Sequence, residues 1–552
     1  MEVGAELIES GMKGPPIRSL CVRPTGGGKS LVFNAVAGVL HGITLCICPL
    51  LSLGADQTKK IFSKTFSDCT SITAFHLDEL SNTAIGKLKR FLDKPANHTN
   101  SKSIILFASP QAITRRYNPL LQYLINRNLI RLLVVDEIHL VSQFGNSFRE
   151  EFLLLKDMLF KKLNPSIPML FLTATCSSLI AADIQTMFGI EFNRSHWPPP
   201  IDMVHRSVKV NVTYTTRAFQ HIQKTIKKDL TVHPTLPNKV IVYSNRRIRI
   251  FNFAEKLEKF LDADPDFKTV DVLTLTGTLT KEEKASFIRM FINGSSKADS
   301  TLDMRVLCAT SGVGNAGIDS PDIRSVYRID FPPSILDMVQ ERGRAGRRPG
   351  ASSLDYNYHV CISIESFLFL FKRILNPNEK FNNESYRQRQ IDDLLHVANV
   401  IISKQCYAVA FETQLGNPFS ASIELPPCYD CPSCLEIKLF PKLNRQGVVE
   451  VLFDYFITTS TVLHKTLANT IDYIRKVPNV DHIIFRKKLK KLNPLFIKKM
   501  LFVLIASKIL TVRFDPTIGA AGDLSLHLAK INSGFVLALC DDNCWSNIEL
   551  II

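Results

Sequence analysis

The chain has 552 residues, 45% of them hydrophobic, and is therefore long enough for several domains with substantial cores. Its net charge is 67 − 51 = +16, which suits a polyanionic partner but does not by itself identify one. No apolar run approaches the ~18 residues that a membrane span needs. Thirteen cysteines without a signal peptide lead us to expect a reducing, intracellular compartment and no disulfide framework.

A glycine-rich segment near the start of the chain predicts a phosphate-binding loop. Residues 24–30 read Pro-Thr-Gly-Gly-Gly-Lys-Ser, between an expected buried strand at 20–22 and an expected helix at 30–42. The backbone N–H groups of such a loop can surround phosphate oxygens, the lysine can reach the β- and γ-phosphates, and the serine can hold Mg²⁺. Arg23 stands where the first glycine of the common pattern would be, so an ordinary glycine-rich turn is the alternative. The predicted nucleotide-binding residues are Thr25, Gly26, Gly27, Gly28, Lys29 and Ser30, with Ser30 also a magnesium ligand.

An acidic pair follows the apolar run 131–135 and predicts the second half of a hydrolytic site. Asp136 can hold Mg²⁺, and Glu137 can polarise the attacking water. A solvated acidic loop is the alternative, but the pair and the upstream loop together favour hydrolysis of a nucleoside triphosphate. Residues 171–175 add two hydroxyls after another apolar strand, and these are suited to relaying the state of the nucleotide.

From Lys239 the α/β pattern restarts, with strands expected at 240–243 and 305–310. Residues 340–347 then carry Arg344 and Arg347, three positions apart, which would share one face if the segment were helical. An arginine from a neighbouring lobe can neutralise the charge that phosphoryl transfer leaves on the γ-phosphate. A solvated basic turn is the alternative reading. Two α/β lobes that act on one nucleotide are typical of a motor.

These segments resemble the motifs of the RecQ family of superfamily 2 helicases over roughly residues 15–435. The loop at 24–30 is the family's own, and the other motifs are matched at 49–53 with Asp56 and Gln57 (Ia), 109–111 (Ib), 136–139 (DEAH), 172–175 (III), 243–246 (IV), 317–322 (V) and 340–347 (VI). The resemblance implies an α/β fold of two RecA-like parallel-sheet lobes, with ATP and Mg²⁺ as cofactors. It assigns transition-state stabilisation to Arg344 and Arg347, and nucleotide contacts to Asp319 and Gln340.

Residues 141–149 are similar to the aromatic-rich loop that, in RecQ helicases, couples contact with single-stranded DNA to ATP hydrolysis. Aromatic side chains suit this role because base stacking contributes roughly 1–3 kcal/mol per base and tolerates any sequence. Ordinary core packing is the alternative for the two phenylalanines. Departures from the family, namely no glutamine motif near residues 6–9 and one extra residue in motif V, are what an amino-terminally truncated or divergent member would show. The predicted DNA-binding residues are Ser142, Gln143, Phe144, Phe148 and Arg149.

Four cysteines predict a structural zinc site, since a tight CxxCxxC triple with one distant partner supplies four thiolates. Free thiols in a loop are the alternative. RecQ proteins carry a similar zinc-binding subdomain just after motif VI, where it holds the chain together. The predicted ligands are Cys406, Cys428, Cys431 and Cys434.

We expect four domains, with a polyproline connector at 197–200 between the first two. Helices at 447–456, 461–475 and 494–510, followed by a strand at 511–514, suggest a winged helix, which RecQ proteins commonly use to grip duplex DNA. The basic run 486–491 either contacts phosphates or is a solvated face. The expected domains are a first RecA-like ATP-binding lobe at 1–196, a second RecA-like lobe at 206–365, a zinc-binding helical subdomain at 366–437 and a winged-helix-like domain at 438–552.

The sequence therefore predicts an ATP-dependent, 3′ to 5′ DNA helicase of RecQ type that acts on single-stranded and duplex DNA in repair or recombination. A eukaryotic member of the family would be nuclear. One alternative is a DNA-stimulated ATPase that translocates without unwinding. A catalytically silent DNA-binding protein is the other, although Lys29, Asp136, Glu137 and Arg347 argue against it.

Overall fold

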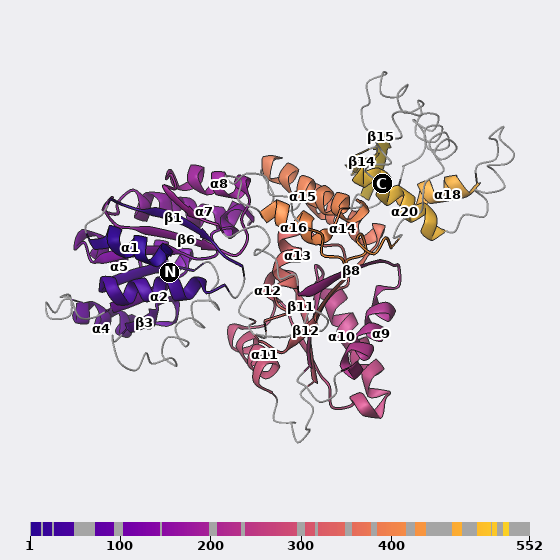
Figure 1. The fold of residues 1–552 in the computed structure, drawn as a ribbon, viewed down its shortest axis with the longest axis horizontal. Coiled ribbons are helices and arrows are strands. Elements are labelled where there is room, and N and C mark those ends of the chain that lie inside the picture. Colours follow the sequence, from indigo (N-terminus) through magenta and orange to yellow (C-terminus); the bar gives the residue numbers. More distant parts are fainter. Residues whose placement is uncertain are drawn as a thin grey trace. The chain divides into compact units, whose positions relative to one another are not determined.

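The chain forms two compact units in the computed structural model (Figure 1). The first comprises Met1–His205, Asn315–Asp319 and Glu412–Leu425, and the second comprises Arg206–Gly314, Ser320–Phe411 and Pro426–Ile552. The structure describes residues 2–12, 15–24, 27–48, 72–92, 103–143, 146–197, 207–232, 238–294, 304–314, 318, 320–347, 356–376, 384–403, 405–415, 426–437, 466–476, 494–508, 510–515 and 523–528.

The first unit is built on a seven-stranded, wholly parallel sheet with the strand order β3-β4-β2-β5-β6-β1-β7. Its central strands are continuous apolar runs because both faces of the sheet are covered. Every residue of β4, for example, is buried. The strands are β1 (Arg18–Val22), β2 (Gly42–Ile47), β3 (Ile72–His76), β4 (Ser103–Ala108), β5 (Ile130–Val135), β6 (Met169–Thr173) and β7 (Arg194–His196).

Helices cover both faces of this sheet. On one face, Val3 of α1 and Phe33 of α2 pack against Leu170 and Leu172 of β6. Phe171 points to the opposite face, because side chains alternate along a strand, and it stacks with Phe160 at a centroid distance of 6.1 Å. The helical elements are α1 (Glu2–Met12), α2 (Lys29–Leu40), η1 (Leu77–Glu79), α4 (Asn82–Leu92), η3 (Ala112–Arg116), α5 (Asn118–Asn126), α6 (Leu140–Gln143), α7 (Asn146–Leu155), η4 (Lys156–Phe160) and α8 (Ser178–Phe188).

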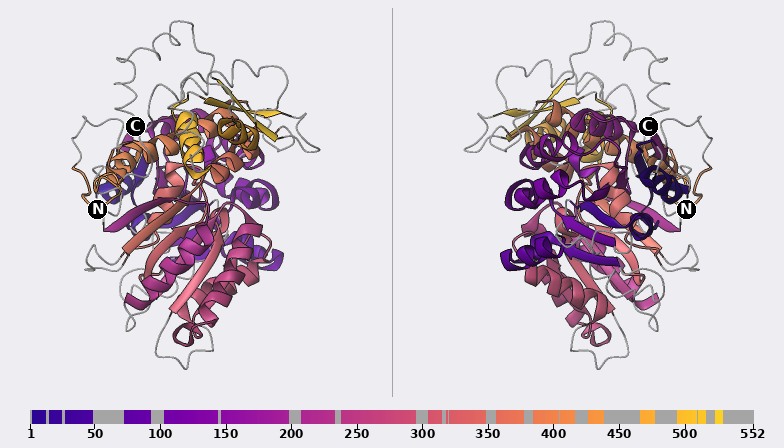
Figure 2. Two further views of the ribbon diagram at one scale, coloured as in Figure 1. Left: turned by 90° about the vertical axis from the view of Figure 1, so that its right-hand side faces the viewer. Right: turned by 90° about the vertical axis from the view of Figure 1, so that its left-hand side faces the viewer.

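The second unit has a six-stranded parallel sheet with the order β10-β11-β9-β12-β13-β8. Figure 2 shows the ribbon from two opposite sides, with the strands of this unit lying among its helices. Ile222 of α9 and Phe253 of α10 pack on Val240 and Val306 of this sheet. The strands are β8 (Val208–Tyr214), β9 (Asn238–Ser244), β10 (Asp271–Leu275), β11 (Met304–Thr310), β12 (Ile323–Arg328) and β13 (Tyr356–Ile362). The helices are α9 (Ala218–Val232), α10 (Arg247–Asp262), η6 (Pro265–Phe267), α11 (Lys281–Asn293), α12 (Ser311–Gly314), α13 (Ile335–Arg342) and α14 (Ile364–Leu375).

The carboxyl-terminal part of the chain adds four helices and a hairpin among the described residues. The ring of Phe502 on α20 packs against three aromatic rings of the second unit. Its centroid lies 6.0 Å from that of Tyr214, 5.8 Å from that of Phe331 and 5.0 Å from that of Phe367. The helix expected at 447–456 and the basic run 486–491 lie outside the described residues. The elements are α15 (Glu384–Ile402), α16 (Tyr407–Leu415), α18 (Leu467–Lys476), α20 (Pro494–Ala506) and the antiparallel strands β14 (Leu510–Asp515) and β15 (Asp523–Leu528).

A search of the described helices for a membrane span gave none that is both long enough and apolar enough.

Candidate nucleotide site, arginine turn and cysteine cluster

The glycine-rich loop lies between β1 and α2, where tight backbone geometry requires glycine. The N–H of Gly27 donates to the carbonyl of Pro24 at 2.9 Å. A Cβ on Gly27 would lie 2.9 Å from that same oxygen, so a side chain there would clash. Gly28 has φ = +78°, a left-handed conformation that glycine adopts without strain. Thr25 and Gly26 lie outside the described residues.

Lys29 is the first residue of α2, and Ser30 follows it in the first helical turn. The ammonium of Lys29 donates a hydrogen bond of 3.2 Å to the carbonyl oxygen of Arg23. Arg23 in turn donates its N–H to the carbonyl of Thr173 on β6 at 3.0 Å. Arg23 therefore takes part through its backbone, which explains how an arginine is accommodated at a position where a glycine was expected.

Asp136 follows β5 at the carboxyl edge of the sheet and is only 3% exposed. Its N–H donates to the carbonyl of Ile47 at 2.9 Å, and its carboxylate accepts the N–H of Glu137 at 2.9 Å. Burial, together with the charge of Glu137, raises the pKa of Asp136 to about 7, and the charge of Lys29 opposes this rise. Lys29 and Asp136 are thus close enough to act on each other, as the predicted site requires.

His139 joins the acidic pair to the segment that follows β6. Its Nδ1 atom lies 2.8 Å from the hydroxyl oxygen of Thr173 and 3.3 Å from a carboxylate oxygen of Glu137. The Thr173 hydroxyl donates to the carbonyl of Thr175 at 2.8 Å, so it is available to accept a proton carried on Nδ1. Burial lowers the pKa of His139. A neutral imidazole therefore donates to the expected hydroxyl relay and lies beside the expected base without a hydrogen bond to it.

The aromatic-rich segment forms α6 and the start of α7. Ser142, Gln143, Phe148 and Arg149 are helical, but their side chains lie outside the described part of the structure, as does Phe144 altogether.

Further along α7, Glu151 is buried and accepts a hydrogen bond of 2.9 Å from the hydroxyl of Thr114. It also pairs with Arg115. Thr114 and Arg115 lie just after residues 109–111, which resemble motif Ib. Helix α7, in which the aromatic-rich segment ends, therefore contacts the segment that follows motif Ib.

The arginines at 340–347 do not share a helical face, which corrects the conditional expectation from their spacing. Helix α13 ends at Arg342, and Gly343 and Arg344 form a turn. The side chain of Arg342 is buried and donates to the carbonyl of Val208 through Nε at 3.1 Å and Nη2 at 2.6 Å. The turn, rather than the helix, therefore presents the two arginines that follow.

Arg344 and Arg347 are partly exposed, and Arg347 donates from Nε to the carbonyl of Gly343 at 2.9 Å. Burial raises the pKa of Tyr243, while the charges of both arginines lower it, so both act near the end of β9. Gln340 is half-buried on α13, and Asp319 lies outside the described residues.

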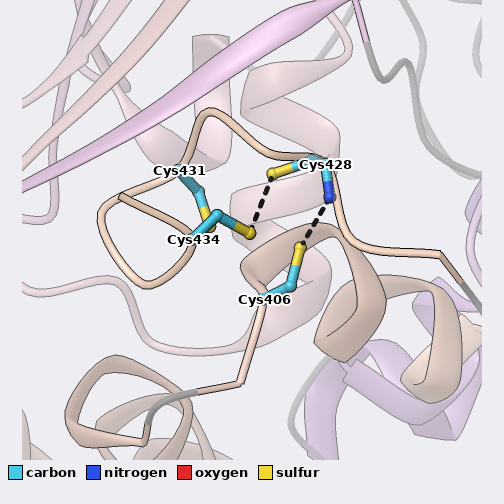
Figure 3. A group of neighbouring side chains, drawn as sticks. All are labelled: Cys406, Cys428, Cys431 and Cys434. Atoms are coloured by element: carbon cyan, nitrogen blue, oxygen red, sulfur yellow. Dashed lines mark hydrogen bonds between the residues drawn. The ribbon is translucent and has the colours of Figure 1, made fainter. Parts of the chain in front are cut away.

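The four predicted zinc ligands come together (Figure 3). Their sulfur atoms all lie within 4.8 Å of one another, and those of Cys428 and Cys434 are 4.0 Å apart. A tetrahedral zinc site with Zn–S bonds of about 2.3 Å places its sulfur atoms about 3.8 Å apart. The donor set and its spacing therefore fit zinc.

Comparisons with known proteins agree with this architecture. The model of the DEAD/DEAH box helicase domain matches residues 5–182, and that of the helicase conserved C-terminal domain matches residues 220–349. The RecQ-like DNA helicase blm-1 of Caenorhabditis elegans is 28% identical over 351 residues, which cover 62% of this chain and 32% of that protein. The ATP-dependent DNA helicase RecQ of Pasteurella multocida is 25% identical over 450 residues, 81% of this chain and 61% of that protein. The chain therefore carries the DEAD/DEAH box helicase domain and the helicase conserved C-terminal domain, and it is similar to RecQ-like DNA helicases.

Two further comparisons show how far the similarity to RecQ-like helicases extends. A putative ATP-dependent DNA helicase Q1 of Caenorhabditis elegans is 28% identical, and the aligned part covers 47% of that protein. The chain thus matches less than half the length of this relative and of blm-1. The solved structure of the DUF1998 helicase MrfA, bound to DNA and AMPPNP, has a TM-score of 0.50 and 15% identity over 67% of this chain and 49% of that chain. This likeness supports the fold of the two RecA-like lobes.

Sequence reasoning missed three functional candidates in this RecQ-like chain. The link from His139 to Thr173 and the carboxylate of Glu151 were not recognised, and neither was Arg328, which is wholly buried at the end of β12. Arg328 had one signal: an arginine at the carboxyl end of an apolar strand, where parallel sheets collect polar functional groups.

Proposed function

We propose that the chain is an ATP-dependent DNA helicase that moves 3′ to 5′ on single-stranded DNA and unwinds duplexes during DNA repair or recombination. The single observation that carries the proposal is geometric: the loop with Lys29 follows β1 and the buried Asp136 follows β5, so both lie at the carboxyl edge of the first sheet. Glu137 follows Asp136 directly, and its carboxylate lies 3.3 Å from Nδ1 of His139, which also contacts Thr173. This is the donor set that hydrolysis of a nucleoside triphosphate requires.

In this proposal, Lys29 binds the β- and γ-phosphates, and Ser30 and Asp136 hold Mg²⁺. The loop glycines fit this role because Gly28 adopts a left-handed backbone that leaves the N–H groups free of side-chain crowding. Bound Mg²⁺ would neutralise charge on the phosphate oxygens. Glu137 orients and deprotonates the attacking water, with the neutral His139 beside its carboxylate. Further nucleotide contacts are assigned to Thr25, Gly26, Gly27, Asp319 and Gln340.

Arg344 and Arg347 are proposed to stabilise the transition state, since each supplies a fixed positive charge from the turn after α13. Single-stranded DNA is assigned to the aromatic-rich segment, through Ser142, Gln143, Phe144, Phe148 and Arg149. Helices α18 and α20 with the β14–β15 hairpin are the expected parts of a winged helix that grips duplex DNA. The cysteine cluster binds zinc and holds its subdomain together.

The test is ATP hydrolysis by the purified chain, with and without single-stranded DNA. We expect DNA to stimulate hydrolysis. We expect Lys29→Ala to lower the stimulated rate by at least about 100-fold, because it removes the positive charge that stabilises the negative charge developing on the phosphate. Lys161→Ala is the matched control, since Lys161 lies on the surface of the same unit and pairs only with Asp157 among the contacts described. Near-normal turnover by Lys29→Ala would refute the site.

A second candidate is a DNA-stimulated ATPase that translocates without unwinding. The observation that favours it lies in α1, where residues 6–9 lack the family's glutamine motif and Glu6 is instead paired with His196 at 2.8 Å. A strand-displacement assay separates the two functions. Robust ATP turnover with no displaced strand would select the translocase.

A further inference from the structure

Arg328 gathers four structural elements of the second unit at the carboxyl edge of its sheet. It is the last residue of β12 and has no exposed surface. Its guanidinium donates to Glu341 on α13 and to Asn245 after β9. It also donates to the hydroxyl of Ser311 after β11 at 3.2 Å, and lies 3.4 Å from Asp330.

The partners of Arg328 are themselves fixed. Glu341 is fully buried and accepts the hydroxyl of Tyr358, on β13, at 2.9 Å. Asp330 accepts the N–H of Asn245 at 2.8 Å and the hydroxyl of Ser244 at 2.6 Å. Burial works against the charge of Arg328, yet the carboxylates of Glu341 and Asp330 raise its pKa above the ordinary value. The guanidinium of Arg328 is therefore charged, and its partners are held by further hydrogen bonds of their own.

This network ends directly at the turn that carries the functional arginines. The carbonyl of Glu341 accepts the N–H of Arg344 at 3.1 Å, and the carbonyl of Arg342 accepts the N–H of Ala345 at 3.1 Å. Ala345 is fully buried, so its packing holds the turn in place. Any shift of Glu341 would therefore move the backbone that presents Arg344.

Stability alone is a poor reason for such a network. Well-packed apolar residues in place of a buried ion pair are often equally or more stabilising, because desolvation opposes the Coulomb attraction. A planar guanidinium with several donors in a fixed fork is, by contrast, well suited to setting the relative positions of several groups. Displacement of a catalytic group by about 1 Å can cost about 100-fold in rate.

We infer that Arg328 is a positioning residue for ATP hydrolysis: by holding Glu341 against Asn245 and Ser311, it sets the backbone of the turn at 343–347 and with it the two arginines. The inference rests on the proposed function of that turn. It assigns to Arg328 a role that acts through Glu341 and not by contact with nucleotide.

The first variant is Arg328→Lys, which keeps one positive charge but cannot reach Glu341, Asn245 and Ser311 together. We expect kcat for ATP to fall about 10- to 100-fold while KM changes less than about 2-fold, because positioning acts on the transition state. The matched control is Arg305→Lys, a buried arginine of the same unit at the start of β11, whose Nη1 donates to the carbonyl of Phe291 at 2.9 Å. Its kcat should stay within about 2-fold of the parent value.

The double variant Arg328→Met/Glu341→Gln separates positioning from folding. It removes both charges of the pair, so Tm should recover relative to Arg328→Met alone. A positioning role predicts that kcat stays low despite this recovery. Recovery of kcat together with Tm would show a merely structural role and overturn the inference.

Hydrogen exchange of the amides of Arg344 and Ala345 gives a readout that does not depend on turnover. We expect Arg328→Lys to lower their protection while leaving the amides of β10 unchanged. If the parent chain hydrolyses no ATP, the proposed function fails, and this exchange result still tests the positioning. Unchanged protection at Arg344 would overturn the inference whether or not ATP is hydrolysed.

Discussion

Glu137 combines a strained backbone with a chemical role. Its φ is +47°, a left-handed conformation that is uncommon for any residue other than glycine. Such strain persists only where the surroundings hold it, and it is concentrated at functional sites. Here the surroundings are Asp136, which accepts its N–H, and His139, which lies beside its carboxylate. The strain thus supports the assignment of Glu137 as the base.

His359 in the second unit predicts a pH dependence of stability. Its ring stacks on Tyr327 with centroids 4.8 Å apart, and Nε2 lies 4.0 Å from Asp229. Burial lowers the pKa of His359 to about 4, the charge of Asp229 opposes this, and that of His221 adds to it. Because the folded pKa lies below the unfolded one, this stability is complete above about pH 6.5 and is lost as the pH falls towards 4, by on the order of 3 kcal/mol.

The variant His359→Gln tests this dependence, since it cannot take up the proton. Urea unfolding of the parent and the variant should be compared at pH 7.5 and at pH 4.5. We expect the free energy of unfolding of the parent to fall relative to that of the variant at pH 4.5. An unfolding free-energy difference that does not change with pH would contradict the assignment.

At the scale of elements, the cysteine loop makes the sharpest prediction. Cys431 is 1% exposed and is the most buried of the four cysteines. We expect Cys431→Ser to reduce bound zinc to well below one equivalent and to make residues 405–437 sensitive to protease, because structural zinc contributes folding energy directly.

The matched control is Ser433→Ala, which changes the same loop without removing a thiolate. Ser433 donates to the carbonyl of Ser403 at 3.5 Å, a weak contact whose loss should leave zinc in place. Metal analysis and limited proteolysis measure both variants. Full zinc content in Cys431→Ser would show that this cysteine is not a ligand.

The strands were largely predictable from the sequence because parallel strands buried on both faces are continuous apolar runs. The expected strand at 131–135 is β5, Ile130–Val135, and that at 305–310 is β11, Met304–Thr310. The helix expected to reach Gly42 ends at Leu40, since His41 and Gly42 adopt positive φ and begin the next strand. The helix expected at 461–475 is α18, and residues 461–465 lie outside the described range.

The candidate site could be predicted from the sequence only where a local pattern marks each residue. Lys29 and the pair Asp136–Glu137 were found because a loop or a strand end places them. The contact between His139 and Thr173 depends on β5 lying next to β6, and that of Arg328 with Asn245 depends on β9 lying next to β12. No local sequence pattern specifies the strand order of a parallel sheet, so these two contacts could be recognised only in the structure.

At the scale of the whole molecule, the residues proposed to act in ATP hydrolysis belong to two different units. The first unit holds Lys29, Asp136 and Glu137, and the second holds Arg344 and Arg347. The net charge of +16 adds a general attraction to polyanions, which salt would weaken. A motor needs more than attraction, because DNA must also change the rate of hydrolysis.

The last prediction tests that coupling in the intact chain. We expect Phe148→Ala to keep the DNA-free rate of ATP hydrolysis but to raise the single-stranded DNA concentration for half-maximal stimulation by about 10-fold, since each stacked base contributes roughly 1–3 kcal/mol. Leu153→Ala is the matched control, because Leu153 is an apolar residue of the same helix, α7, and is 45% exposed. Equal losses in both variants would indicate damage to α7, and no loss in Phe148→Ala would remove the aromatic-rich segment from the coupling. Only a loss of DNA stimulation confined to Phe148→Ala supports base stacking on α7 as the step that couples DNA binding to Asp136 and Glu137.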